Sequence, residues 1–163
     1  MADDPRDIPA WQRLGERVTT SGRLQADDLP RLAAIGVRHV VNLALTDSPG
    51  ALPGEDALAA AEGLRYTHIP VPFDAPTEAH YQAFRAAVSG ESEPLHVHCI
   101  MNWRVSAFFF RYHREQGMPE AEARALLERQ WSPETAVHQD GPAWARFIAG
   151  PWAGAGAGAG AGA

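Results

Sequence analysis

The sequence has one cysteine and no long apolar run, and each absence excludes a class of protein. A single cysteine, Cys99, cannot form an internal disulfide or a four-cysteine metal site, so it is either a small buried hydrophobe or a nucleophile. The strongest apolar stretch, residues 107–110, is far too short to span a bilayer, and the charged N-terminal segment does not resemble a signal peptide. The sequence therefore predicts a cytoplasmic protein that is not bound to a membrane.

Positive charge is scarce and dispersed along the chain. The 163 residues include 14 Lys and Arg against 20 Asp and Glu, which gives a net charge of −6 at pH 7. Nucleic acids and anionic membranes bind dense positive surfaces, so neither is an expected partner. A small anionic ligand is compatible with this balance, because one local site can still be cationic.

The composition divides the chain into one domain and a tail. Residues 1–150 have the length and apolar content of a single globular domain. Residues 151–163 read PWAGAGAGAGAGA and contain almost nothing that could anchor a core. A flexible low-complexity extension is favoured for this tail over a silk-like strand that pairs between molecules.

Strand-like and helix-like segments alternate through the domain. Helical periodicity with start and stop signals covers 26–35, 55–62, 77–88, 105–116, 119–131 and 142–148, whereas 37–45, 64–71 and 95–98 are rich in strand-forming residues. This alternation predicts a three-layer α/β/α domain with a central sheet of four or five mostly parallel strands. Such sheets hold their sites at the carboxyl ends of the strands, and Cys99 lies at one of these ends.

The residues that follow Cys99 fit an anion-binding loop. A helix N-terminus presents unpaired backbone N–H groups, which favour both a thiolate and an incoming oxyanion. Arg104 adds a planar fork for two phosphate oxygens. Asn102 stands where the loop needs a positive φ, and Ser106 in the first helical turn can donate toward the sulfur. Taken singly, Cys99 is more often a small buried hydrophobe, His98 a hydrogen-bonded core residue and Arg104 a surface cation. Together they favour an anion-binding nucleophile.

The stretch His98-Cys99-Ile100-Met101-Asn102-Trp103-Arg104-Val105-Ser106 resembles the signature loop of the cysteine-dependent phosphatases, which reads His-Cys, five residues, Arg, then Ser or Thr. The upstream segments TTSGRLQADDLPRLAAIGVRHVVNLAL and AAAEGLRYTHIPVPFDAPT are also similar to the compact bacterial members of the tyrosine and dual-specificity-like group. The resemblance runs from about Thr19 to about His113. It implies a phosphate-binding loop formed by Ile100, Met101, Asn102, Trp103 and Arg104.

The loop departs from the family pattern in one respect. Only four residues separate Cys99 from Arg104, and Val105 stands where the family has its arginine. One residue of helix corresponds to a rotation of about 100°. Two outcomes follow: either the loop contracts so that Arg104 still points to the phosphate, or the phosphate grip is lost. We expect contraction, because Arg104 is the only cation in residues 100–107.

The resemblance implies a mechanism with named roles. The thiolate of Cys99 attacks phosphorus, Arg104 holds the phosphate oxygens, and an aspartate donates a proton to the leaving group. Asp74 follows the 64–71 strand and occupies the place of that acid, although a helix-capping or turn role fits Asp74 equally well. Asp47 and Asp140 are weaker candidates. His98 and Ser106 are expected to support the loop.

Three functions therefore remain open. The first is a phosphatase that acts on phosphotyrosine-like phosphomonoesters, without a metal or another cofactor. The second is a pseudophosphatase that captures phosphorylated partners without turnover. The third is a rhodanese-like sulfurtransferase, because that fold also uses a six-residue active loop, the length from Cys99 to Arg104. Trp103 either walls the pocket or packs beneath it, and the sequence does not determine the oligomeric state.

Overall fold

The computed structural model describes residues 2–157, with side chains through residue 150. Five strands and six helices lie within that range. The strands are β1 (Gln12–Arg13), β2 (Val18–Ser21), β3 (His39–Asn42), β4 (Arg65–His68) and β5 (Leu95–His98). The helices are α1 (Asp28–Ala34), α2 (Glu55–Ala61), α3 (Glu78–Ser89), α4 (Trp103–Glu115), α5 (Glu120–Glu128) and α6 (Gly141–Ala157).

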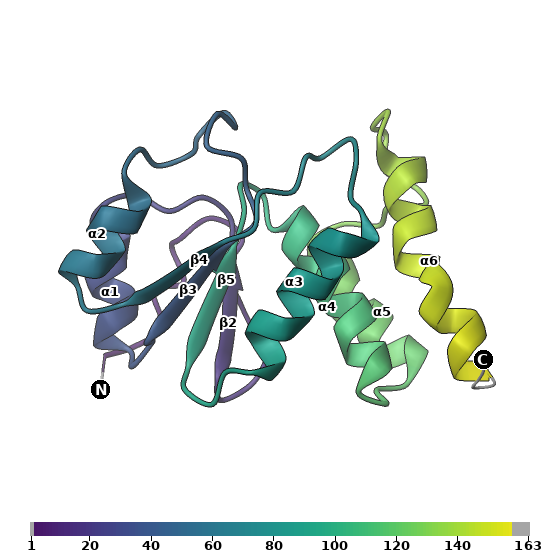
Figure 1. Ribbon diagram of the computed structural model, residues 1–163, viewed down its shortest axis with the longest axis horizontal. Helices are drawn as coiled ribbons and strands as arrows, with labels where there is room; N and C mark the ends of the chain where they lie inside the picture. Colours follow the sequence, from purple (N-terminus) through teal and green to yellow (C-terminus); the bar gives the residue numbers. More distant parts are fainter. Residues whose placement is uncertain (1, 158–163) are drawn as a thin grey trace.

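The strands form one sheet in the order β1-β2-β5-β3-β4, in which β1 alone runs antiparallel to its neighbour. The parallel strands are in register, because His98 at the end of β5 pairs with Ser21 of β2 and with Asn42 of β3. Their carboxyl ends therefore meet at one edge, the upper edge in Figure 1. Ligands of open α/β sheets bind at this edge, and β5 leads there directly into Cys99.

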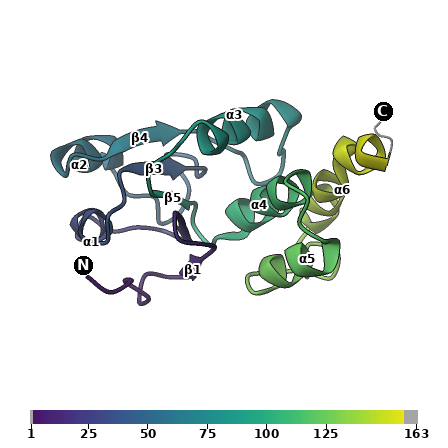
Figure 2. The same ribbon diagram turned by 90° about the horizontal axis from the view of Figure 1, so that it is seen from below.

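Helices cover both faces of the sheet, as parallel strands with two apolar faces require (Figure 2). Leu29, Leu32 and Val40 belong to the core beneath α1 and α2. Val41 and Phe108 belong to a larger core beneath α3 to α6. Val40 and Val41 are neighbours in β3, so the pleat points their side chains to opposite faces. The predicted three-layer α/β fold with a mostly parallel sheet is confirmed.

The predicted elements are present, with ends that differ by a few residues. The largest consequence is at α4, which begins at Trp103, two residues before its predicted start, and so includes Arg104 in its first turn. Neither β1 nor β2 is predicted from the sequence. The reason is that β1 has only two residues and β2 reads Val-Thr-Thr-Ser, with a single aliphatic side chain.

Helix α6 extends past residue 150, where the domain is predicted to end. Its backbone is helical except at Gly150, where φ of 44° and ψ of 169° interrupt the helix. The Ala/Gly tail predicted for 151–163 thus starts next to a break in the helix, and residues 158–163 lie outside the described part of the chain. Within residues 2–157, no helix is long and apolar enough to cross a membrane.

Candidate active site

The chain leaves β5 and turns at once into α4. Asn102 forms this bend with φ of 65°, the left-handed conformation that the sequence predicts for it. Asn adopts this conformation more readily than most residues with a side chain. The Asn102 side chain also anchors the loop, because its Nδ2 donates to the Ala10 carbonyl oxygen at 2.9 Å and to Thr20 Oγ1 at 3.0 Å. Asn102 therefore fixes both the shape of the loop and its position against β2.

The loop lies directly against the turn that follows β2. The backbone N–H of Arg23 donates to the Ile100 carbonyl oxygen at 2.9 Å. A Cβ atom added to Gly22 would lie 2.4 Å from the same oxygen. Because this distance is far below van der Waals contact, only glycine permits such a close approach of the two backbones.

Six consecutive backbone amides in the loop have no acceptor. The Cys99 N–H donates to the Ser21 carbonyl oxygen at 3.4 Å, and the first bond of α4 runs from the Ser106 N–H to the Asn102 carbonyl oxygen. Between them, the N–H groups of residues 100–105 donate no hydrogen bond within the described chain. Consecutive unpaired N–H groups at a helix N-terminus attract anions. The loop is thus prepared to receive an oxyanion.

Arg104 is buried and carries an uncompensated charge. The residue is only 6% exposed. Its Nη1 donates to the Val71 carbonyl oxygen at 2.8 Å. The guanidinium carbon lies 5.9 Å from the ring centroid of Phe73. No carboxylate within residues 2–150 forms an ion pair with Arg104. The structure therefore directs Arg104 inward, away from the surface position that was the alternative.

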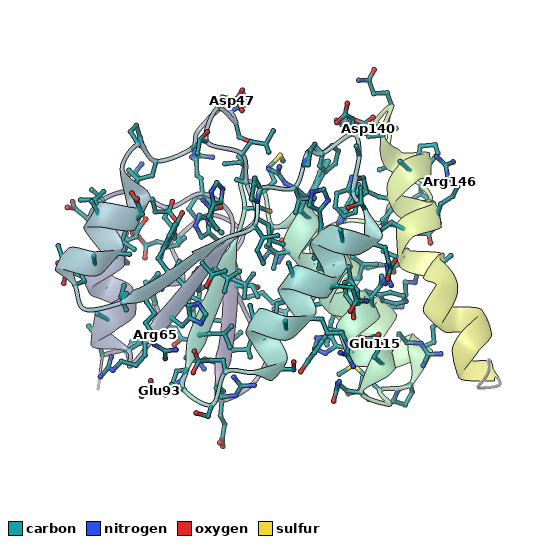
Figure 3. The ribbon with its side chains drawn as sticks, in the orientation of Figure 1. Asp47, Arg65, Glu93, Glu115, Asp140 and Arg146 are labelled. Carbon is teal, nitrogen blue, oxygen red and sulfur yellow. The ribbon has the colours of Figure 1, made fainter. Side chains whose placement is uncertain are left out.

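Cys99 and Arg104 line the same cavity, which has a volume of about 550 Å³. Its other lining residues are Leu45, Asp47, Ser48, Pro49, Phe73, Ile100, Met101, Trp103 and His138. Arg104 is the only Lys or Arg side chain in this lining. The cavity lies at the carboxyl edge of the sheet, where Asp47 is labelled at the top of Figure 3. A single anionic group therefore finds one cation and one row of amides here.

An aromatic cluster forms one wall of this cavity. Trp103 stacks on Trp131 with ring centroids 4.7 Å apart and planes inclined by 1°. The ring centroid of Phe73 lies 5.8 Å from that of Trp131 and 5.0 Å from that of His138, and the Phe73 and His138 planes are inclined by 75°. The sequence leaves open whether Trp103 walls the pocket or packs beneath it. In the structure Trp103 does both, because it lines the cavity and also stacks on Trp131.

A buried pair supports the loop from behind. His98 Nε2 lies 2.5 Å from Glu55 Oε2, and the two side chains are 2% and 4% exposed. His98 Nδ1 lies 3.0 Å from the Cys99 carbonyl oxygen. Because a carbonyl oxygen can only accept, Nδ1 carries a proton and donates to it. The pair therefore ties the start of α2 to the backbone of the cysteine.

The neighbouring His96 stabilises the pairing of β5 with β2. Its Nδ1 lies 2.9 Å from Thr19 Oγ1 and its Nε2 lies 2.8 Å from Ser21 Oγ. Complete burial, with a smaller contribution from the nearby His98, lowers the pKa of His96 well below its usual value. His96 is therefore a neutral hydrogen-bonding residue of the core. Within the described residues, no group of three or more His, Cys, Asp or Glu side chains is arranged to hold a metal ion.

Four of the predicted site residues do not line the cavity: His98 and Asn102, which hold the loop through the contacts described above, and Asp74 and Ser106. Asp74 is exposed in the turn that follows Phe73, and it is absent from the cavity lining. The Ser106 hydroxyl donates to the Trp103 carbonyl oxygen at 3.1 Å, so it closes the first turn of α4. The remaining predicted residues of the loop lie together around Cys99.

Two residues of the site are not predicted from the sequence. Glu55 lies 43 positions from His98 in the sequence. It is the first residue of an Ala-rich helix, where acidic residues are common because they interact favourably with the helix dipole. His138 lies in an irregular segment before α6 that carries no motif. A buried partner for His98 could have been sought near the strand ends, but the sequence has no signal for His138.

A parallel sheet, a cysteine at the end of its central strand, an amide-lined loop and a buried arginine define a class of protein. This is the fold of the cysteine-based phosphatases, and the resemblance found in the sequence is confirmed. Residues 11–110, more than half of the chain, match the family described as beta-lactamase hydrolase-like protein, phosphatase-like domain. The chain belongs to this family.

Two curated relatives carry the same name, beta-lactamase hydrolase-like protein. The protein from Agrobacterium fabrum is 32% identical over 90 residues, and the one from Xylella fastidiosa is 35% identical over 89 residues. These alignments cover 53% of this chain and 21% of each relative. The chain therefore matches about a fifth of the length of these relatives.

Solved structures share the fold over most of the domain. A candidate phosphatase from Shewanella putrefaciens CN-32 superposes with a TM-score of 0.74 and 26% identity, covering 88% of this chain and 93% of that one. TpbA from P. aeruginosa, solved in complex with pTyr, superposes with a TM-score of 0.67 and 18% identity, covering 90% and 87%. The second likeness concerns the fold alone.

Proposed function

We propose that this chain is a cysteine-dependent phosphatase that hydrolyses phosphomonoesters of the phosphotyrosine type through a phosphocysteine intermediate. One observation carries the proposal: Cys99 and Arg104 line one cavity, and the six backbone amides of residues 100–105 donate no hydrogen bond within the described chain. Membership of a phosphatase-like family supports the same reaction. An aromatic wall that includes Phe73 and Trp103 suits a substrate whose phosphate is carried by a ring.

In the first step the Cys99 thiolate attacks phosphorus in line with the leaving oxygen. The sulfur–phosphorus bond forms as the phosphorus–oxygen bond breaks, and the leaving oxygen takes a proton from an acid. Arg104 and the amides of the loop hold the three equatorial oxygens, where negative charge is concentrated in the transition state. These groups are already in place before the substrate arrives, so little reorganisation is required.

In the second step a water molecule attacks the phosphocysteine. The water gives its proton to the carboxylate that donated in the first step, and the sulfur–phosphorus bond breaks to release inorganic phosphate and the thiolate. His98 keeps the Cys99 backbone fixed through its Nδ1 hydrogen bond. Ser106 supports the loop through the Trp103 carbonyl, holding the first turn of α4.

The early arginine fits this mechanism because α4 begins early. Arg104 is the second residue of α4, and the left-handed Asn102 reverses the chain just before it. The loop between Cys99 and Arg104 is one residue shorter than the family pattern, yet its arginine is buried next to the cavity. A contracted loop of this kind is a smaller cradle that still surrounds one phosphate group.

We propose Asp74 as the acid, because it adjoins Phe73, a lining residue of the cavity. Asp74→Asn should lower kcat on phenyl phosphate by about 10²-fold and should have less effect on p-nitrophenyl phosphate, whose leaving group needs little protonation. Asp47 provides the matched comparison, since it is a lining residue of the cavity and Asp74 is not. A larger loss in Asp47→Asn than in Asp74→Asn would assign the acid to Asp47.

A binding function without turnover is the second candidate. It is favoured by one observation, the exposed position of Asp74 outside the cavity lining. Capture of a phosphorylated partner needs only Arg104 and the loop amides. Turnover also needs an ionised Cys99 and a placed acid.

The deciding experiment measures phosphate release from p-nitrophenyl phosphate without added metal. The phosphatase proposal expects turnover that vanadate inhibits and that Cys99→Ser abolishes. Full activity in Cys99→Ser would exclude the covalent mechanism, and binding of phosphotyrosine without turnover would establish the second candidate. Sulfur transfer from thiosulfate to cyanide at a rate well above phosphate release would instead indicate a sulfurtransferase.

A further inference from the structure

A second cavity lies at the opposite edge of the sheet, where the parallel strands begin. Its volume is about 750 Å³. Its lining comes from the β1–β2 turn, the α1–β3 link and the α3–β5 link: Arg13, Gly15, Glu16, Arg17, Thr19, Ile35, Gly36, Val37, Arg38, Glu93 and Pro94. Figure 3 places Glu93 at the bottom of the molecule and Asp47, a residue of the first cavity, at the top. The two cavities are therefore separate.

Three arginines line this second cavity, in a chain with an overall charge of −6. Arg13 is already saturated: it forms a fork with Asp4 at 2.7 Å and donates to the Gly15 and Glu16 carbonyl oxygens. This guanidinium holds the pKa of the Asp4 carboxyl below its usual value. Arg13 therefore closes the β1–β2 turn and is not available to a ligand.

Arg17 and Arg38 are the available cations. Arg17 Nη1 is buried and has no hydrogen-bond partner, and its side chain forms no ion pair within the described residues. Arg38 uses Nη1 for the Val37 carbonyl oxygen and makes no ion pair in the same range. A buried guanidinium nitrogen without a partner is costly, so an anion that draws the Arg17 guanidinium toward the cavity would offset that cost.

The acids of this cavity only partly offset the two arginines. Glu93 is engaged by Arg65 at 2.7 Å. Glu16 is exposed and carries one negative charge at the margin. Counting Arg17 and Arg38 against Glu16 leaves one net positive charge. The cavity therefore favours an anion over a cation.

Backbone hydrogen bonds connect the segments that line this cavity. The Leu95 N–H donates to the Arg17 carbonyl oxygen at 2.9 Å, and the Arg38 N–H donates to the Pro94 carbonyl oxygen at 2.9 Å. These bonds join the three segments that carry the lining. The two arginines are thus held on a fixed frame, which lowers the entropy lost when a ligand binds.

We propose that the cavity around Arg17 and Arg38 is a second anion site, which binds the phosphate or carboxylate group of a small ligand. The planar fork of Arg17 binds two oxygens of such a group, and Arg38 supplies further charge. A volume of about 750 Å³ leaves room for the body of the ligand beside its anionic group. The site needs neither Cys99 nor the loop that follows it, so it does not depend on the proposed phosphatase activity.

The test follows backbone amide NMR signals while inorganic phosphate or acetate is added at constant ionic strength. Arg104→Ala is used as the background, because it removes the cation of the first cavity. The proposal expects saturable shifts at Gly36, Val37 and Arg38. Whichever probe binds more tightly identifies the anionic group that the site prefers.

Variants then separate the site from general charge effects. Arg17→Gln should weaken binding by about tenfold or more, and Arg17→Lys by less, because it retains the charge without the fork. Arg129→Gln is the matched control, since Arg129 is exposed and lies outside this lining. If Arg17→Gln does not fold, Arg38→Gln takes its place. The absence of saturable shifts at residues 36–38, or equal affinity in Arg17→Gln and Arg129→Gln, would overturn the proposal.

Discussion

Glu55 and His98 form a buried hydrogen-bonded pair with Oε2 and Nε2 2.5 Å apart. The pair connects the first residue of α2 with the last residue of β5, and through His98 it reaches the Cys99 carbonyl oxygen. Both contacts of the imidazole are with oxygen atoms. Any change at Glu55 is therefore transmitted to the backbone that carries the cysteine.

We predict that Glu55→Ala lowers the free energy of unfolding by about 1–3 kcal/mol, because His98 Nε2 then loses its partner inside the core. Glu55→Gln should cost less, since an amide can still pair with the imidazole. Chemical denaturation at pH 7 measures both. Glu62→Ala, at the exposed end of the same helix, is the control. Equal effects at Glu55 and Glu62 would mean that the pair contributes nothing.

Gly22 should tolerate no side chain. A methyl group there would lie 2.4 Å from the Ile100 carbonyl oxygen and 3.2 Å from that of Pro9. We expect Gly22→Ala to displace the loop, to cost about 1–3 kcal/mol of stability, and to lower p-nitrophenyl phosphate turnover more than stability alone explains. Gly15→Ala is the control, because nothing lies within 4 Å of its added methyl group. Normal turnover in Gly22→Ala would show that the loop does not depend on this contact.

The layers of the fold could be predicted because helices and buried parallel strands leave strong local patterns. Residues 95–98 form β5 as predicted. In α3 the buried residues Tyr81, Phe84 and Val88 recur at helical spacing, so they lie on one face of the helix. Strands β1 and β2 could not be predicted in the same way. The partners of β2 are β1 and β5, and its Thr19, Thr20 and Ser21 are buried by pairing and side-chain hydrogen bonds instead of apolar character.

The candidate site was predictable where its residues are consecutive. Cys99, Asn102 and Arg104 belong to one turn, so their spacing and chemistry are visible in the sequence. Glu55 and His138 come from remote segments, and only folding brings them to the loop. Asp74 follows Phe73 in the sequence, and Phe73 lines the cavity, but the Asp74 side chain is exposed to solvent. The sequence does not show which of two adjacent turn residues faces a cavity.

Stability should fall on the acid side of neutrality because of His113. Burial lowers the pKa of His113 to about 4, below the usual value of 6.5. Above pH 6.5 His113 is neutral in both the folded and the unfolded protein, so its protonation does not reduce the free energy of unfolding. As the pH falls from about 6.5 to about 4, His113 becomes protonated in the unfolded chain but stays neutral in the folded chain. The free energy of unfolding therefore decreases by up to about 1.4 kcal/mol per pH unit.

His113→Phe should therefore reduce this slope, while His96 maintains part of it because its pKa is also lowered. Urea unfolding at a series of pH values from 7.5 to 4.5 measures the effect. An unaltered slope in His113→Phe would mean that this imidazole is protonated in the folded protein.

Arg104 decides whether the shortened loop works as a phosphate cradle. Its Nη1 is committed to the Val71 carbonyl oxygen at 2.8 Å, which leaves its other N–H groups for a ligand. Lysine at this position keeps the charge but lacks the planar fork, so it can either replace the Val71 contact or approach the phosphate, not both. We expect Arg104→Lys to bind phosphate measurably and to lower kcat/KM on p-nitrophenyl phosphate by about 10²-fold. Arg129→Lys, an exposed change of the same chemistry, should have wild-type kinetics. If Arg104→Lys also has wild-type kinetics, the guanidinium takes no part in turnover, and the proposed role of Arg104 in this loop is wrong.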